Sequence, residues 1–359
     1  MLLSIPFPSW LTPEIFPNMP GMLGIIRWYG LMYFFAFGTA YLLYRRQVKE
    51  RNFPMTDDDL TGLFVCGIVS LLLGARLFST LIYDTSGIYW RAPWLIFWPF
   101  RNGQFTGLMG MSYHGGVIGG ALSIVIYSKI KKWDAREIGD MYAASIPLGF
   151  TFGRLGNFLN GELYGRITAR PWGVVFPNAG IPPWHRDFEA IRQGAEQLGI
   201  QAVVEAGGAL NFPRHPSQLY QMFFEGIVLW AIIWFFRNRK PFKGFLITLY
   251  LSGYGLFRFF IEYFRQPDAH IGYPIQLVHT GIPPALAHHP LNFTTGQILC
   301  FIMFVSGLVW AFFASRMKNP EPVRVYPSVE EKQNENLQKL NEEKAAQRKN
   351  RRKLRNKLR

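Results

Sequence analysis

The sequence predicts an all-α polytopic membrane protein with seven transmembrane helices, and three observations support this prediction. The chain of 359 residues is 49% hydrophobic and only 17% charged, whereas an average soluble domain is about 25% charged. It contains apolar segments of about 20 residues, the length that a helix needs to cross a bilayer. Short loops rich in lysine and arginine alternate with longer loops rich in proline, glycine and tryptophan.

The predicted spans set the topology. They cover residues 22–44, 60–83, 114–130, 138–159, 218–236, 244–264 and 295–315. Seven spans put the two termini on opposite sides of the membrane. The short loops after the first, third and fifth spans are the basic ones, and basic loops stay in the cytoplasm. We therefore expect the N-terminus outside the cytoplasm and the C-terminus inside it.

The segments between and after the spans suggest two parts. Residues 1–317 form the seven-span domain, in which residues 160–214 are long enough for a small folded head and contain a Trp-Gly-Val-Val-Phe-Pro stretch typical of a strand or turn. Residues 318–359 form a basic cytoplasmic tail, either a short polar helix or disordered, that anionic lipid would attract. Nothing resembling a nucleic-acid-binding fold accompanies the tail, so we expect no nucleic-acid partner.

Several classes of chemistry lack a signature in this chain. Cys66 and Cys300 lie in apolar runs without a paired cysteine, so we interpret both as core thiols. The histidines lack metal-ligand spacing, and no Gly-rich nucleotide loop precedes a helix. We predict no metal and no cofactor. The first twenty residues contain no lysine or arginine, which argues against a cleaved signal peptide with a basic leading region.

Residues 153–165 are the most informative stretch, because they place an arginine, amides and a carboxylate at the end of an apolar segment. Hydrocarbon barely solvates such groups, so they need partners. On a helix, Arg154 and Asn157 share a face. Two interpretations fit: a binding site, or an arginine that extends to the headgroups beside amides that cap a helix.

The sixth predicted span carries polar side chains at spacings of four, four and three, which puts Tyr254, Arg258, Glu262 and Arg265 on one stripe. Arg154 and Arg258 suit a phosphate, because guanidinium presents a planar fork to its oxygens. The alternative for Arg258 is an internal ion pair with Glu262.

Further polar residues carry the same ambiguity. Gln218, Gln221 and Glu225 share a face of the fifth span and suit either substrate contact or an interhelical hydrogen-bond network. Arg76 in the second span suits a side chain that extends to the headgroups. His114 lies at a helix start, where the macrodipole keeps the ring neutral, as a general base requires.

The glycines after His114 have spacings typical of helix packing. By the predicted topology, the polar clusters gather at the outer ends of the spans. A site with arginines and a base but no nucleophile of its own suggests that both reactants come from outside, one of them an anionic lipid. The rival interpretation is a transporter or flippase for an anionic lipid or solute, which would show broken helices and polar groups on both sides. A membrane acyltransferase is a second rival.

Four blocks of the sequence resemble the prolipoprotein diacylglyceryl transferase family of bacteria. Residues 153–162 read Gly-Arg-Leu-Gly-Asn-Phe-Leu-Asn-Gly-Glu, residues 113–116 read Tyr-His-Gly-Gly, and residues 215–220 read His-Pro-Ser-Gln-Leu-Tyr. Residues 258–268 match the fourth block, and the blocks occur in the family's order. The likeness runs from about residue 28 to residue 297 and leaves out the tail.

This resemblance implies an enzyme of the bacterial inner membrane with a periplasmic N-terminus and head. It implies transfer of the sn-1,2-diacylglyceryl group of phosphatidylglycerol to the lipobox cysteine of prolipoproteins, which forms a thioether and releases glycerol phosphate. The partners would be phosphatidylglycerol, the signal peptides of prolipoproteins and membrane lipid. The implied catalytic residues are His114, Arg154, Tyr254 and Arg258. The implied substrate-binding residues are Tyr29, Arg154, Asn157, Glu162, Gly165 and Arg265.

Overall fold

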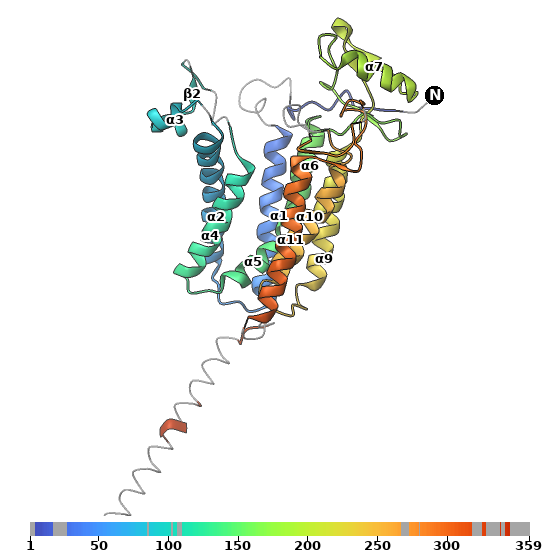
Figure 1. Cartoon of the computed structure of the whole chain (residues 1–359). Coiled ribbons are helices and arrows are strands. Elements are labelled where there is room, and N and C mark those ends of the chain that lie inside the picture. Colours follow the sequence, from blue (N-terminus) through green and yellow to red (C-terminus); the bar gives the residue numbers. More distant parts are fainter. Residues whose placement is uncertain are drawn as a thin grey trace, which may run out of the picture.

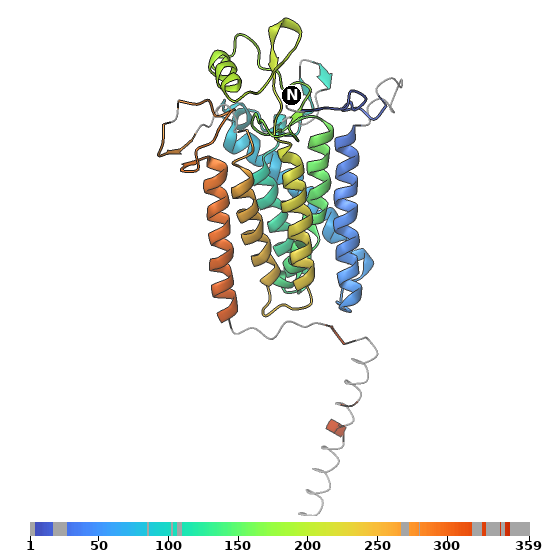
Figure 2. The ribbon, with the colours of Figure 1, turned by 90° about the vertical axis from the view of Figure 1, so that its right-hand side faces the viewer.

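The computed structural model describes residues 4–16, 27–84, 86–101, 103–105, 110–266, 273–279, 281–317, 325–327, 338 and 342–344. Long helices run side by side through the molecule, with a head that contains α7 at one end and α5 near the other (Figure 1). Figure 2 shows the head covering the ends of the helices. The prediction for the tail falls almost entirely outside the described residues.

The long helices pack in pairs. In the described chain, α2 lies along α4, α1 along α6 and α10 along α11. The bundle helices are α1 (Trp28–Glu50), α2 (Asp57–Phe78) with its π-helical continuation η2 (Ser79–Tyr83), α4 (Tyr113–Ile130), α5 (Ala135–Ala143), α6 (Ile146–Leu159), α8 (Ser217–Gln221), η5 (Met222–Val228), α9 (Leu229–Phe236), α10 (Phe245–Ile261) and α11 (Thr295–Arg316).

The composition of these helices is that of a membrane protein. Three described helical stretches are long and apolar enough to cross a bilayer, namely Asp57–Ile82, Ser217–Phe236 and Thr295–Arg316. Two shorter helices, Gly115–Ile130 and Phe245–Ile261, are also apolar. On α11 many large apolar side chains are exposed, including Phe301 and Phe313. An exposed apolar surface of this extent indicates contact with lipid.

The fourth predicted span is not one helix, which corrects the prediction for residues 138–159. The chain breaks at Ala144 and Ser145 into α5 and α6. Pro147 lies in the first turn of α6. Proline has no N–H to donate, and its ring clashes with the carbonyl four residues back, here that of Ala143, the last residue of α5. Proline is tolerated in the first turn of a helix but kinks or breaks a helix that runs through it, which accounts for the start of α6 at Ile146.

Helix starts are set by local side chains. Thr56 before α2 and Thr294 before α11 form capping boxes with Asp59 and Gln297, which satisfy backbone N–H groups that lack an intrahelical partner. The start of α10 is capped from another helix. Asp140 of α5 accepts hydrogen bonds from the backbone N–H groups of residues 244, 246 and 247, at 3.0, 2.8 and 3.2 Å.

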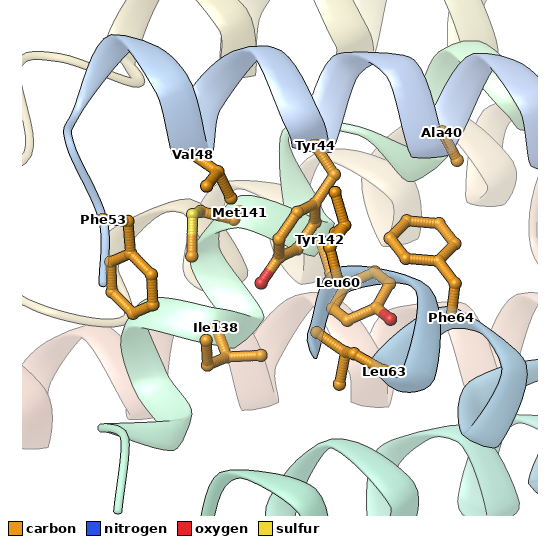
Figure 3. Close-up of a cluster of buried hydrophobic side chains, with 10 residues drawn as sticks. All are labelled: Ala40, Tyr44, Val48, Phe53, Leu60, Leu63, Phe64, Ile138, Met141 and Tyr142. Atoms are coloured by element: carbon orange, nitrogen blue, oxygen red, sulfur yellow. The ribbon is translucent and has the colours of Figure 1, made fainter. Parts of the chain in front are cut away.

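A buried apolar cluster joins α1, α2 and α5 (Figure 3). Helix α5 lies near the end of the bundle away from the head (Figure 1). The rings of Tyr44, Phe64 and Tyr142 contact one another. The centroid of Tyr44 lies 5.5 Å from that of Phe64 and 4.9 Å from that of Tyr142, and the last two are 5.3 Å apart. Tyr326, far along the chain, packs against Phe53 and donates a hydrogen bond to Glu137. This cluster therefore ties the α2–α4 pair and residues 325–327 to the rest of the bundle.

The head is built from short elements around its own core. Helix α7 (Phe188–Gln197) packs into a buried cluster with Ile167, Ile181 and Phe212. Three pairs of two-residue strands lie here and in the segment before α11. The pair of β1 (Ile5–Pro6) with β4 (Val174–Val175) is parallel. The pairs of β5 (Val203–Val204) with β6 (Leu210–Asn211) and of β7 (Ile275–Gln276) with β8 (Asn292–Phe293) are antiparallel. The 3₁₀ turn η4 (Ala206–Gly208) connects β5 and β6. The Trp-Gly-Val-Val-Phe-Pro stretch thus contains a strand, as one of its two interpretations predicted.

The segment between α2 and α4 is also structured, and it explains Arg76. It contains α3 (Ile88–Arg91), the 3₁₀ helix η3 (Pro93–Ile96) and the hairpin of β2 (Phe100–Arg101) with β3 (Gln104–Phe105). Arg76 is buried and donates to the carbonyls of Ile96, Gly110 and Leu95. The prediction that Arg76 extends to the headgroups is wrong, because its donors hold this segment in place.

The two cysteines differ in their surroundings. Cys300 is buried, as predicted for a core thiol, whereas Cys66 is exposed on α2. The prediction that Cys66 is a core thiol is therefore wrong. An apolar sequence run around Cys66 does not distinguish protein core from a lipid-facing surface, since both are apolar.

Candidate functional site

Arg154, Asn157 and Glu162 form a continuous polar chain where α6 meets the head. Arg154 Nη1 donates to Oδ1 of Asn157 at 3.3 Å, and Asn157 Nδ2 donates to Oε1 of Glu162 at 2.9 Å. Asn157 is buried, whereas Glu162 is exposed. The predicted shared helix face of Arg154 and Asn157 is confirmed, since a hydrogen bond joins the guanidinium to the amide.

The Arg154 guanidinium lies against one aromatic ring and near a group of others. Its Cζ lies 4.6 Å from the centroid of the Phe150 ring, within cation–π range. Tyr254 of α10 meets the same Phe150 ring edge-on at 5.8 Å. On α1, the hydroxyls of Tyr29 and Tyr33 share a hydrogen bond of 3.1 Å, and Tyr33 interacts electrostatically with Arg154. The structure therefore brings predicted residues from α1, α6 and α10 to one place.

A second charged group lies on α10 and η5. Arg258 Nη2 is 3.1 Å from Oε2 of Glu262, and Arg265 Nη1 is 3.7 Å from Oε1 of the same residue. The internal ion pair considered for Arg258 is thus confirmed. Arg258 Nη1 also lies 3.8 Å from Oε1 of Glu225. Arg258 is in the last turn of α10, where the helix dipole favours a positive charge.

Glu225 connects the two groups. It interacts electrostatically with Arg154 as well as with Arg258 and Arg265. Its segment η5 packs against α6, and this approach needs Gly226, because a Cβ atom there would collide with Thr151 Oγ1. The arginines of α6 and α10 therefore face one shared, mostly buried region.

Several buried polar atoms in this region make no hydrogen bond within the described part of the chain. They are Arg154 Nε, Arg258 Nη1, both carboxylate oxygens of Glu225, Thr151 Oγ1 and Gln218 Oε1. Buried polar atoms in native proteins are nearly always paired with protein or water. Guanidinium donors without acceptors next to other polar atoms are what a site for an anionic, oxygen-rich ligand requires.

Gly165 lies where the head crosses the end of α10. It pairs with Arg265 in an isolated bridge, and its N–H donates to the His215 carbonyl at 2.8 Å. A Cβ atom there would be 2.6 Å from that oxygen and would also collide with the Phe264 carbonyl. Only glycine fits this crossing, so Gly165 sets the position of Arg265 relative to the head.

The block around His215 is structural by its contacts. His215 Nδ1 shares a hydrogen bond of 3.0 Å with the Tyr220 hydroxyl. Burial, followed by the charges of Arg170 and Arg166, lowers the pKa of His215 to about 4, so its ring is neutral at physiological pH. Gln218 Nε2 donates to the backbone carbonyl of Glu162 at 2.6 Å, which supports the network interpretation of Gln218.

His114 can be placed only by its backbone. It is the second residue of α4, whose N-cap Ser112 accepts a hydrogen bond from Gly115 N–H at 3.2 Å. The side chain of His114 lies outside the described residues, so its role as a base stays a prediction. The glycines that follow are packing residues, as their spacing predicts: a Cβ on Gly115 would collide with Gly74 and one on Gly119 with Ser70, both in α2.

The opposite end of the bundle also contains buried charges, which corrects the expectation that the polar clusters gather at one end. Asp140 pairs with Lys240 at 3.2 Å. Glu137 pairs with Arg51 at 3.2 Å and with Lys243 at 3.0 Å. Both carboxylates have a cation close by, and Asp140 also accepts hydrogen bonds from three backbone N–H groups. These contacts hold α5 against the neighbouring segments.

Three relevant residues were not singled out by sequence reasoning. Tyr33 lies one helical turn after Tyr29, and this spacing could have revealed it. Arg166 and Arg214 are buried in the head and donate to backbone carbonyls, of Tyr263 at 3.1 Å and of Ala179 at 3.2 Å. Burial lowers the pKa of Arg214 to about 10. Nothing in their sequence context distinguishes these two arginines from surface residues.

Comparison with known proteins identifies similar sequences over most of the chain. The family described as prolipoprotein diacylglyceryl transferase matches residues 21–313. Proteins named phosphatidylglycerol–prolipoprotein diacylglyceryl transferase are 51% identical in Treponema denticola, over 86% of this chain and 94% of the relative, and 46% identical in Treponema pallidum, over 90% and 99%. The protein of that name in Chlorobaculum tepidum is 38% identical, over 85% and 91%.

Proposed function

The chain belongs to the prolipoprotein diacylglyceryl transferase family, and on that premise we propose that it transfers the sn-1,2-diacylglyceryl group of phosphatidylglycerol to the lipobox cysteine of prolipoproteins. The observation that best supports this activity is that Arg154 and Arg258 both place buried donor atoms that make no hydrogen bond, within the described chain, in this region. These donors suit the phosphate of an anionic lipid. The site would therefore bind the group that leaves in the reaction.

The reaction exchanges one bond for another. The cysteine sulfur forms a bond to C3 of the diacylated glycerol, and the bond between C3 and the phosphate oxygen breaks. That oxygen leaves with the electron pair as part of glycerol phosphate. The thiol, with an ordinary pKa of about 8.5, must lose its proton to a base. His114 or a tyrosine of the site takes this proton, and nearby guanidinium charge stabilises the thiolate.

Arg154 and Arg258 stabilise the departing phosphate. Such electrostatic stabilisation contributes several kcal/mol in many enzymes, provided that the donors are held in place beforehand. Here Asn157 orders Arg154, and Phe150 lies against its guanidinium. Glu162 completes the hydrogen-bonded chain from the head, and Tyr29, Tyr254, Gly165 and Arg265 form the surrounding wall.

The bundle crosses the bacterial inner membrane seven times in this proposal. The spans are α1, α2, α4, the broken pair α5–α6, the stretch α8–η5–α9, α10 and α11. The basic loops put the end with Glu137 in the cytoplasm, and the head with the arginine site then faces the periplasm. Residues 318–359 would be a cytoplasmic tail that binds anionic lipid of the inner leaflet.

Mass spectrometry of a lipobox peptide tests the proposed activity directly. The purified chain is mixed with phosphatidylglycerol and a peptide that contains a single cysteine in a lipobox. We expect the peptide to gain the mass of one diacylglyceryl group and to lose its free thiol. A gain of one acyl chain would instead identify an acyltransferase, and an unchanged peptide would contradict the proposal.

A further inference from the structure

Glu225 is the most deeply buried charged group of the candidate site. It is 1% exposed and lies inside the π-helical segment η5. A π-helical turn is rare and occurs often at functional sites, because it redirects one side chain within an otherwise regular helix. In a bundle surrounded by lipid, a buried carboxylate is stable only when positive charge compensates it.

The compensation for Glu225 comes from the arginines of the site. Its shortest ion pair in the described chain is the 3.8 Å contact with Arg258, and neither carboxylate oxygen accepts a hydrogen bond. Glu262 is different, since it lies 3.1 Å from Arg258 and also contacts Thr294 Oγ1 at 3.5 Å. Glu225 is therefore held by the field of the arginines and not by a close, directional bond.

Three guanidinium groups surround Glu225, those of Arg154, Arg258 and Arg265, together with one further carboxylate, that of Glu262. A phosphate that enters this region meets the arginines and the buried carboxylate together. Because like charges repel strongly where water is scarce, Glu225 and the phosphate compete for the same guanidinium groups.

We propose that Glu225 is a positioning counter-ion: it keeps Arg258 in place in the empty site and weakens the binding of phosphate, so that the site can release its anionic product. The inference rests on the proposed diacylglyceryl transfer, in which glycerol phosphate leaves. Binding that is too strong would stabilise substrate and product as much as the transition state and would slow turnover. Glu225 thus limits anion affinity while the arginines remain available for the reaction.

Inhibition by free glycerol phosphate measures this effect. The full chain is placed in bilayer discs of phosphatidylcholine with phosphatidylglycerol, and the inhibition constant of sn-glycerol 1-phosphate is measured together with kcat and KM. Glu225→Gln removes the charge and keeps the shape. We expect it to lower the inhibition constant at least about tenfold, equivalent to about 1.4 kcal/mol, and to lower kcat without raising KM for phosphatidylglycerol.

Two further variants complete the experiment. Glu225→Asp keeps the charge but moves it away from Arg258, so its inhibition constant should fall between those of Glu225→Gln and the wild type. Glu137→Gln is the matched control, because Glu137 is equally buried and ion-paired at the other end of the bundle. It should leave the inhibition constant unchanged.

The possible outcomes separate the inference from the proposed function. If the wild type transfers diacylglyceryl but Glu225→Gln leaves the inhibition constant unchanged or raises it, the counter-ion role is refuted and the function stands. If Glu225→Gln does not fold, the comparison of Glu225→Asp with the wild type decides in the same way. A wild type without transfer activity refutes the proposed function itself.

Discussion

Replacing Arg154 with lysine tests whether the shape of the guanidinium matters as well as its charge. Arg154 donates to Asn157 at 3.3 Å, lies 4.6 Å above the Phe150 ring and keeps a buried Nε without a hydrogen bond among the described residues. Lysine preserves the positive charge. It replaces a planar fork of donors by a single ammonium group on a flexible chain, so it cannot bind two phosphate oxygens in one plane.

The size of the effect follows from these contacts. The loss of one preorganised donor to a developing negative charge lowers kcat by about 10²–10³-fold, or about 3–4 kcal/mol. The lost contact with Phe150 would add about 0.5–2 kcal/mol, mainly through poorer positioning. We therefore expect Arg154→Lys to reduce kcat at least about 100-fold, whereas KM for phosphatidylglycerol should change less because the charge remains.

The assay is transfer of the diacylglyceryl group to the lipobox peptide, with the thermal unfolding midpoint measured on the same samples. Arg170→Lys is the matched control, because Arg170 is an exposed arginine of the head whose guanidinium lies 6.0 Å from the Trp172 ring. It should retain wild-type activity. If Arg154→Lys folds normally and keeps kcat within about threefold of the wild type, the role of the planar fork in binding the leaving group is refuted.

Three further predictions concern stability. Gly165→Ala should destabilise the fold by about 1–3 kcal/mol through overpacking. Gly153→Ala should not destabilise it, because a Cβ there meets no atom within 4 Å. Equal midpoints of thermal unfolding for the two variants would contradict this prediction. Asp140→Asn leaves the buried Lys240 without its carboxylate and should cost about 3–5 kcal/mol, so an unchanged midpoint in detergent would show that the pair is dispensable. Burial lowers the pKa of His215 to about 4, below the value of about 6.5 in the unfolded chain. The unfolded state therefore binds the proton first, and stability falls as the pH drops from about 6.5 to about 4. His215→Gln should reduce this loss of stability, measured as the difference between the unfolding midpoints at pH 7 and pH 5. If the variant and the wild type show the same difference, His215 is excluded as its source.

Some features of the site could be predicted from local spacing. Arg154 and Asn157 share a helix face, and Arg258, Glu262 and Arg265 share a stripe, because side chains three or four residues apart on a helix are neighbours. The structure confirms both relations. The break of the fourth span was also present in the sequence, as Pro147, but the length of the apolar run concealed it.

Other features depend on packing between distant segments. The position of Arg76 against carbonyls of residues 95–110 requires the fold of a whole connecting segment. The exposure of Cys66 depends on which face of α2 meets α4. Hydrophobicity alone could not decide the case of Cys66, because side chains that face lipid and side chains in the protein interior have the same apolar character.

The amino-acid sequence by itself determined the membrane character, the helical segments, the charge asymmetry of the loops and the family motifs, since each depends on residues close together in the chain. Only the tertiary structure decided which buried charges meet. The contact of Glu225 with Arg258, the pairing of Asp140 with Lys240 and the anchoring of Tyr326 on Glu137 join residues from separate segments. Charges in a region of low dielectric are stabilised by whatever lies within a few ångströms, and that neighbourhood exists only after the helices have packed.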